Sequence, residues 1–105
     1  PNSELRFEGE FNDRFMLITV PLNLTTADTQ GVLKNSPILV LSDNVNITKL
    51  QMIGQDTEEA LILSEDANNL NIEENTLTVN NTQDKIETRS IVVDGGSNIR
   101  ILKNI

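Results

Sequence analysis

The feature that most restricts the fold of this chain is a series of short segments in which apolar and polar residues alternate. Leu5, Phe7 and Phe11 are separated by charged or small residues, and the same alternation returns over 70–73 and 86–93. A period of two places one side of an extended strand in a core and the other in solvent. Asn, Asp and Gly interrupt these segments, as they do at turns. The pattern therefore predicts an all-β chain.

About eight short strands, spaced roughly 8–12 residues apart, favour an antiparallel β-sandwich or Greek-key barrel. In the first predicted hairpin, strands 5–11 and 15–24 flank a turn at 12–14 and bring Phe11 close to Phe15. Asp43-Asn44 suits a two-residue hairpin, because Asn and Asp tolerate the positive φ angles that such turns require.

The alternative is a parallel β-helix, a solenoid in which each coil stacks on the one before. Asn followed by Leu or Ile occurs at Asn23, Asn46, Asn71 and Asn98, with spacings of 23, 25 and 27 residues. Coils of parallel β-helices are of similar length, and Asn-rich turns suit them. The turns at 43–44 and 94–98 are too short to be crossovers between parallel neighbours in one sheet. The antiparallel fold is therefore the expectation, and the solenoid is kept as the alternative.

Two segments are read less directly. The apolar parity changes between Ile47 and Leu50, which predicts a β-bulge near Thr48 or Lys49. Residues 57–68 fit either a short strand or a helix, because a capping-box spacing precedes them and apolar residues are clustered inside them. The strand is favoured.

Size and composition indicate one β-rich domain spanning 1–105, either complete or cut from a longer parent. Ile, Leu, Val and Phe make up about a third of the residues, well above the range of disordered chains. The three aromatic residues are Phe7, Phe11 and Phe15, so most of the core must be aliphatic. Phe7 and Phe11 have the same parity and are expected to pack in the core from one strand.

The chain contains no His, Cys, Trp or Tyr. These residues supply most bases active near neutral pH, thiol nucleophiles, zinc ligands and base-stacking rings. We therefore expect no enzymatic activity, no catalytic residues and no cofactor. A carboxylate-dependent hydrolase is an unfavoured alternative, because 16 acidic residues would place some pair close together by chance.

Calcium is the metal that the composition would suit best, since it prefers oxygen ligands. The richest acidic cluster is formed by Glu65, Asp66, Asn68, Glu73 and Glu74. Its spacing does not fit an EF-hand loop, because the fifth position counted from Asp66 is an apolar residue, Leu70. No metal site is assigned from the sequence.

The charge balance restricts the partners. Eight basic and 16 acidic residues give a net charge of −8, and no basic residue occurs between Lys49 and Lys85. Such a surface disfavours nucleic acids and anionic membranes. No apolar run is long enough to span a bilayer.

The sequence therefore favours a non-enzymatic structural or interaction module, such as a component of a phage or virus particle or of a surface appendage. The expected location is a virion, the cell surface or the extracellular space. Self-association is expected through the edges of strands 15–24 and 99–105. A carbohydrate- or protein-recognition domain is the alternative, weakened for sugars by the lack of Trp and Tyr.

Overall fold

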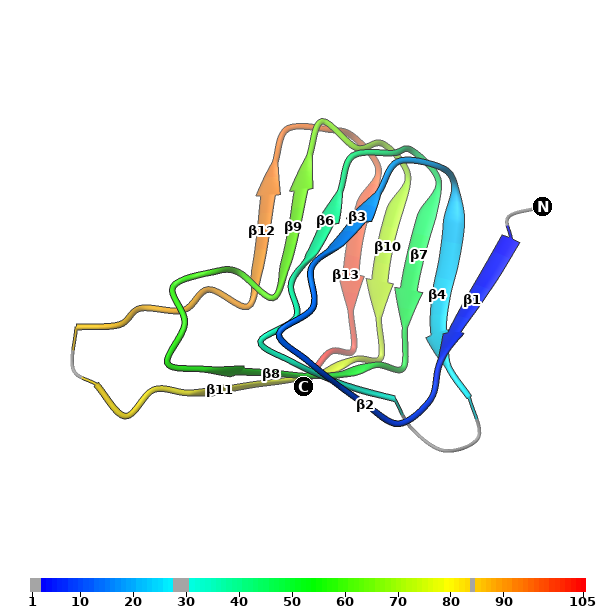
Figure 1. The fold of residues 1–105 in the computed structure, drawn as a ribbon. Helices are drawn as coiled ribbons and strands as arrows, with labels where there is room; N and C mark the ends of the chain where they lie inside the picture. Colours follow the sequence, from blue (N-terminus) through cyan, green and yellow to red (C-terminus); the bar gives the residue numbers. More distant parts are fainter. Residues whose placement is uncertain (1–2, 28–30, 84) are drawn as a thin grey trace.

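The computed structural model describes residues 3–27, 31–83 and 85–105, which form thirteen β-strands and no helix. Every strand pairing is parallel. The strands lie in three sheets around a common interior (Figure 1). The all-β prediction is confirmed, but the antiparallel sandwich or barrel is wrong. The chain forms the alternative fold, a parallel β-helix.

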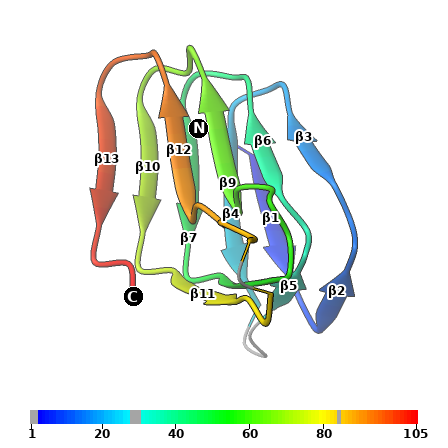
Figure 2. The same cartoon turned by 90° about the vertical axis from the view of Figure 1, so that its left-hand side faces the viewer.

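Each of the first four coils contributes one strand to each sheet, β13 adds a fifth strand to sheet A, and consecutive strands therefore always belong to different sheets. Sheets A and C face one another with their strands running in opposite directions, and sheet B joins them at the base (Figures 1 and 2). Sheet A contains β1 (Ser3–Phe7), β4 (Leu22–Thr26), β7 (Val45–Thr48), β10 (Leu70–Glu73) and β13 (Ile99–Leu102). Sheet B contains β2 (Glu10–Asn12), β5 (Val32–Lys34), β8 (Gln51–Gln55) and β11 (Thr76–Asn80). Sheet C contains β3 (Met16–Ile18), β6 (Ile38–Val40), β9 (Ile62–Glu65) and β12 (Ile91–Asp94).

The turns that indicated hairpins are corners between sheets. Asp43-Asn44 leads from β6 in sheet C to β7 in sheet A, and 95–98 leads from β12 to β13. Asn44 and Asn98 have φ angles of 59° and 54°. A tight turn with positive φ can bend the chain into a new sheet as readily as it can reverse it. The strands that flank each corner therefore pair with the neighbouring coil and not with each other.

The first predicted hairpin is also wrong, because residues 3–18 form three strands in three sheets. Phe7 and Phe11 lie on β1 and β2, not on one strand, and their rings meet edge to face with centroids 5.6 Å apart. Both contribute to the core as expected, whereas Phe15 is 63% exposed.

The two predicted edge segments have different outcomes. Segment 15–24 is divided between β3, which is an edge of sheet C, and β4, which lies between β1 and β7. The segment beginning at Ile99 does form an edge strand, β13. The predicted loops over 25–30 and 81–84 reach positions 28–30 and 84, which lie outside the described residues, and 25–26 belong to β4.

The predicted bulge is another corner. Lys49 directly follows the last residue of β7 and has a φ angle of 61°, and Leu50 then turns inward with no exposed surface. The parity change in the sequence records this change of sheet. Segment 57–68 contains strand β9 and no helix, so the favoured interpretation is confirmed.

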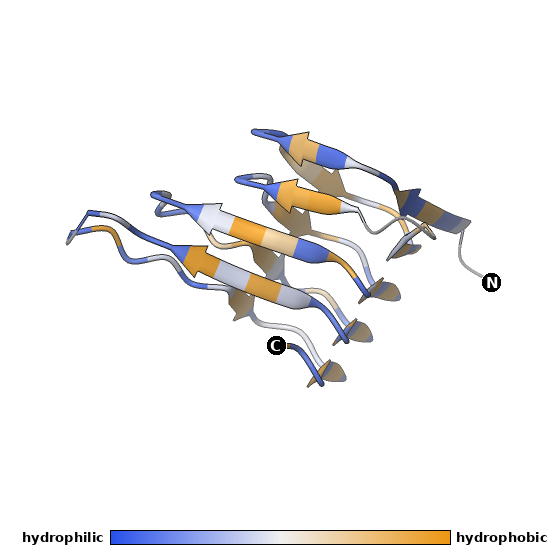
Figure 3. Ribbon diagram, turned by 90° about the horizontal axis from the view of Figure 1, so that it is seen from below, coloured by the Kyte–Doolittle hydropathy of each residue, from blue (hydrophilic) through white to orange (hydrophobic). Residues whose placement is uncertain are grey.

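The core is built from columns of side chains that repeat at the same place in successive coils. The strand register aligns residues about 4.8 Å apart along the stack, and the interior is aliphatic as predicted. Figure 3 shows hydrophobic and hydrophilic residues alternating along β11, the edge strand of sheet B. The main inward columns are Leu24–Ile47–Ile72, Val45–Leu70, Leu33–Met52 and Ile38–Ile62.

The Asn spacing in the sequence is largely a coil repeat. Asn23, Asn46 and Asn71 are in register on sheet A, but the next residue in their column is Arg100. Asn98 instead continues a neighbouring column at the corner. The mismatch arises because the step from Asn71 to Arg100 is 29 residues (100 − 71), lengthened by residues between β11 and β12.

Candidate interaction surfaces

The outer faces of the three sheets differ in chemistry. Because successive side chains on a strand point to opposite faces, the residues between the inward columns point outward. On sheet A the outward positions of β4, β7 and β10 are mainly amides and hydroxyls, while β1 and β13 add charged residues and Leu102. On sheet B the outward positions are mostly polar or charged, with two aliphatic residues. On sheet C one complete outward column is apolar, and it contains Leu17, Leu39, Leu63 and Val92.

This leucine column is accessible to water. Leu17 is 51% exposed and the other three members are partly exposed. Four residues at the strand spacing make it about 14 Å tall. Phe15 before β3 and Leu41 after β6, 63% and 42% exposed, add apolar surface near it. A contiguous exposed apolar surface on a small domain is a mark of an interaction site.

An open groove of about 440 Å³ lies beside the last two members of the leucine column, Leu63 and Val92. Its apolar part comes from the strands and the loop before β9, and its charged part comes mainly from the excursion, defined as residues 81–83 and 85–90. The excursion projects away from the sheets at the left of Figure 1. The groove is lined by Glu58, Ala60, Leu63, Lys85, Glu87, Arg89 and Val92.

Hydrogen bonds fasten the excursion to the coil below it. The Asp56 carboxylate accepts from the Thr82 backbone N–H at 2.7 Å and from the Thr82 hydroxyl at 2.8 Å. These two bonds favour the ionised form and hold the pKa of Asp56 below its ordinary value. The Asn81 amide donates to the Thr88 hydroxyl at 3.1 Å, and that hydroxyl donates to the carbonyl of Thr57. Hydrogen bonds therefore hold both ends of the excursion, which forms the charged side of the groove.

The two ends of the sheet C strands carry different charges. Before their starts lie two cations, Arg14 and Arg89, together with the acids Asp13, Glu58, Glu59 and Glu87, and Lys85 lies farther out in the excursion. At their ends lie Glu65 and Asp94, and segments 19–20, 41–43, 65–66 and 94–96 contain no basic residue. We call these the start flank and the acidic flank of the leucine column.

Sheet A presents a polar face built from amide ladders. The Asn46 amide donates to the Asn23 side-chain carbonyl at 2.6 Å. At the corner before the sheet, Asn69 donates to Asn44 at 3.1 Å and Asn98 donates to Asn69 at 2.9 Å. These bonds repeat from coil to coil, so the amides are held in fixed rows.

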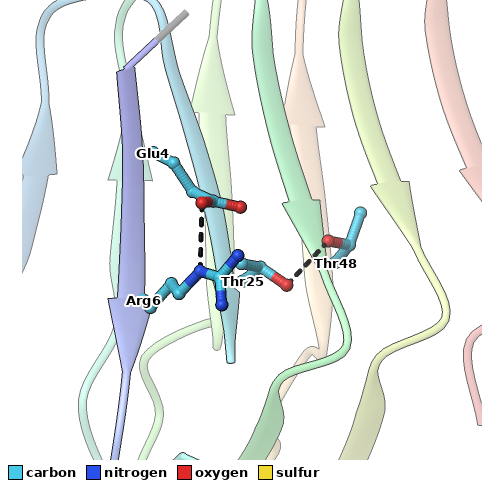
Figure 4. Close-up of polar contacts among 4 residues, drawn as sticks. All are labelled: Glu4, Arg6, Thr25 and Thr48. Carbon is cyan, nitrogen blue, oxygen red and sulfur yellow. Dashed lines mark hydrogen bonds and ion pairs between the residues drawn. The ribbon is translucent and has the colours of Figure 1, made fainter. Parts of the chain in front are cut away.

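Other polar groups extend this face. Figure 4 shows the Thr48 hydroxyl donating to the Thr25 hydroxyl at 3.3 Å and, on the edge strand, an Arg6–Glu4 ion pair at 3.0 Å. A shallow depression on the same face is lined by Asn46, Asn69, Leu70, Asn71, Glu73, Asn98 and Arg100.

The acidic cluster considered for calcium is divided between corners. Glu65 and Asp66 lie at the end of β9, at the corner from sheet C to sheet A, whereas Glu73 and Glu74 lie at the opposite end of β10. Within 3–27, 31–83 and 85–105, no three His, Cys, Asp or Glu residues are grouped so as to hold a metal ion. No helix in the described ranges could cross a membrane.

The leucine column was missed by sequence reasoning, although a signal for it exists. Met16-Leu17-Ile18, Ile38-Leu39-Val40 and Ile91-Val92-Val93 are unbroken apolar runs. A run of this kind means that both faces of the strand are apolar. In a sandwich this is typical of a fully buried strand, but in a solenoid coil one of the two faces must point outward.

Comparison with known proteins gives no relative: no family model, no curated protein and no solved structure matches this chain.

Proposed function

We propose that this chain is a non-enzymatic structural building block that assembles with copies of itself through the outer face of sheet C. The leucine column is the observation that carries the proposal. Covering it would remove four aliphatic side chains from water, and burial of such surface contributes about 25 cal/mol per Å². Specific interfaces have apolar centres with polar rims, which is the arrangement of the column and its charged flanks.

A solenoid suits this role because its outer faces are flat and repeat from coil to coil. Such surfaces can be matched over several coils by a partner with the same repeat. The sequence adds a chemical argument, since its residue types offer few groups for catalysis near neutral pH. Particle components and surface appendages are assemblies of this kind.

Light scattering across a range of protein concentrations tests the proposal. The wild-type chain should form an oligomer whose mass falls on dilution. Leu39→Glu places a carboxylate in the middle of the column and should give a monomer. Asn46→Glu places the same group on the outer face of sheet A and should leave the oligomer intact. A wild-type chain that stays monomeric at high concentration would refute self-assembly.

A second candidate function is glycan binding by the polar face of sheet A. The supporting observation is the depression in which fixed amides lie beside Glu73 and Arg100. These groups offer both donors and acceptors for hydroxyl groups, and no aromatic platform is needed for such contacts. Binding on a glycan array that is lost in Asn71→Ala and kept in Leu39→Glu would support this function. An array with no binding would exclude it for the glycans presented.

A further inference from the structure

We infer that the β1 edge of sheet A pairs with the same edge of a second copy. The two strands run antiparallel and are centred on Leu5, so that Glu4 of each copy lies opposite Arg6 of the other. This contact uses a different surface from the leucine column, so it does not depend on assembly through sheet C. It follows from the main-chain direction and the charges of β1.

β1 is the edge strand of sheet A at one end of the solenoid (Figure 1). Among the described strands it pairs with β4 alone. Ala27, directly after β4, donates its backbone N–H to the Phe7 carbonyl at 2.9 Å, so Phe7 directs its main chain toward the sheet. Adjacent residues of a strand direct their main-chain groups to opposite edges. Those of Glu4 and Arg6 therefore face away from β4, where they can accept another strand.

The side chains of β1 combine two opposite charges with a partly uncovered leucine. Glu4 and Arg6 lie on the outer face of sheet A and form an ion pair at 3.0 Å within one chain (Figure 4). Leu5 is aligned with the fully buried Leu24 but is 39% exposed, because no described strand lies beyond it. A second strand at this edge would cover Leu5.

A two-fold axis through Leu5, perpendicular to the sheet, makes these features match. Glu4 then lies opposite Arg6 of the copy and exchanges both main-chain hydrogen bonds with it, as facing residues of an antiparallel pair do. The symmetric contact repeats this, so four charges of alternating sign lie together, and opposite charges across two strands stabilise their pairing. Leu5 lies opposite Leu5 of the copy, and each covers the other.

The other edge of sheet A does not offer this match. β13 carries Arg100 and Leu102 on its outer face, so pairing it with its copy sets Arg100 against itself or against an uncharged residue. A head-to-tail contact of β1 with β13 of another copy gives at most one opposite pair, Glu4 with Arg100. The antiparallel β1 pair is the arrangement in which both charges of the strand gain an opposite partner.

The β1 contact is small, because two strands of five residues bury far less than the roughly 1,000 Å² expected of a lasting interface. On its own it therefore forms transiently and leaves the chain monomeric in dilute solution. Copies paired through the leucine column would each carry a free β1 edge, and the β1 contact would join such pairs end to end.

Disulfide trapping tests the contact, since the chain has no cysteine of its own. In the inferred pair the two Leu5 Cα atoms are about 4.5 Å apart, within the reach of a disulfide. Leu5→Cys should therefore give a disulfide-linked dimer under mild oxidation. Ser3→Cys, exposed on the same strand, is the matched control. Its two Cα atoms lie about 14 Å apart across the axis, so it should crosslink at least about tenfold more slowly.

Charge variants of Leu5→Cys test the register. Glu4→Arg sets like charges opposite each other and should slow crosslinking roughly fivefold to tenfold. Glu4→Arg combined with Arg6→Glu restores opposite charges at both contacts and should restore the rate. Equal crosslinking rates for Leu5→Cys and Ser3→Cys, or a charge exchange that does not restore the rate, would overturn the inference.

Two further measurements separate this contact from other assemblies. With Leu39→Glu added, Leu5→Cys should still crosslink, because the leucine column takes no part in the contact; this result does not depend on whether the chain assembles through sheet C. Loss of crosslinking in that variant would overturn the inference. A mixture of Leu5→Cys and Ile101→Cys that yields only the mixed dimer would show the head-to-tail contact with β13 instead.

Discussion

Among the polar residues of the described ranges, Asn75 should be the one whose substitution lowers the free energy of unfolding most. Its side chain is 1% exposed at the corner between β10 and β11. Its carbonyl oxygen accepts from the Leu50 backbone N–H at 3.0 Å, and its amide donates to the Ile47 carbonyl at 3.0 Å. The amide also donates to the side-chain oxygen of Asn104 at 3.0 Å. One side chain thus links three successive coils.

The cost of Asn75→Ala can be worked from these bonds. The substitution leaves the Leu50 N–H and the Ile47 carbonyl without this partner, and both lie in a region closed to water. Each buried group left unsatisfied costs about 1–3 kcal/mol. The lost bond to Asn104 adds about 1 kcal/mol. We expect Asn75→Ala to lower the free energy of unfolding by about 3–7 kcal/mol, a large share of the roughly 5–15 kcal/mol typical of a domain.

Urea unfolding followed by circular dichroism measures this change. Asn71→Ala is the matched control, because its amide lies on the outer face and donates to the Glu73 carboxylate at 3.3 Å. The control should lose less than about 1 kcal/mol. If Asn75→Ala loses no more than Asn71→Ala, the corner amides do not secure the coils and the reasoning is refuted.

Three further predictions concern single residues. Ser64 is fully buried, and its hydroxyl has no hydrogen-bond partner within the described ranges. Because its column neighbours in the adjacent coils are valines, Ser64→Val should raise the free energy of unfolding by about 1–2 kcal/mol. A lower free energy of unfolding in urea would contradict this. Gly96 has a φ angle of 93°, and a Cβ added there would meet the backbone carbonyl of Ala67, whereas Gly9 has a φ angle of 81° and open space around it. Gly96→Ala should therefore lower the melting temperature much more than Gly9→Ala. Equal decreases in melting temperature would show that the close approach of Gly96 to the Ala67 carbonyl is unimportant. The hydrogen bonds from Thr82 lower the pKa of Asp56, so the Asp56–Thr82 contact should persist at pH values above the ordinary pKa of 3.8 and be lost only as the pH falls through the lower pKa of the folded state. The NMR chemical shift of the Thr82 amide should follow this titration, and in Asp56→Asn it should not change with pH in this range.

Strand content and an aliphatic core were predictable because they depend on local pattern. The period of two around Leu70 and Ile72 requires only that one side of the strand be buried, whichever sheet it joins. The topology was harder because a corner and a hairpin use the same residues. Asn44 adopts a positive φ angle, which suits either structure, and the choice depends on which distant segment supplies the hydrogen bonds.

The register of the coils was only partly visible. The Asn23–Asn46–Asn71 column was visible because amides on the outer face repeat. The step to Arg100 was hidden, because the excursion lengthens that coil and a nearby Asn falls at a more regular spacing. The inner Asn75–Asn104 pair has no repeat below it, since Leu50 occupies the same position one coil earlier. A single sequence could not separate that pair from the other asparagines.

An unbroken apolar run is typical of a fully buried strand, but in this fold such a run supports an interface. Ile38-Leu39-Val40 is apolar on both faces, and a sandwich could place both faces inside. A solenoid has one interior, and here it holds Ile38 and Val40, both fully buried. Leu39 must then face outward, and the aligned positions in the other coils are also Leu or Val. An aliphatic residue at each of these four positions, on a face that the fold itself does not cover, is what supports the proposal that a second copy of the chain packs there.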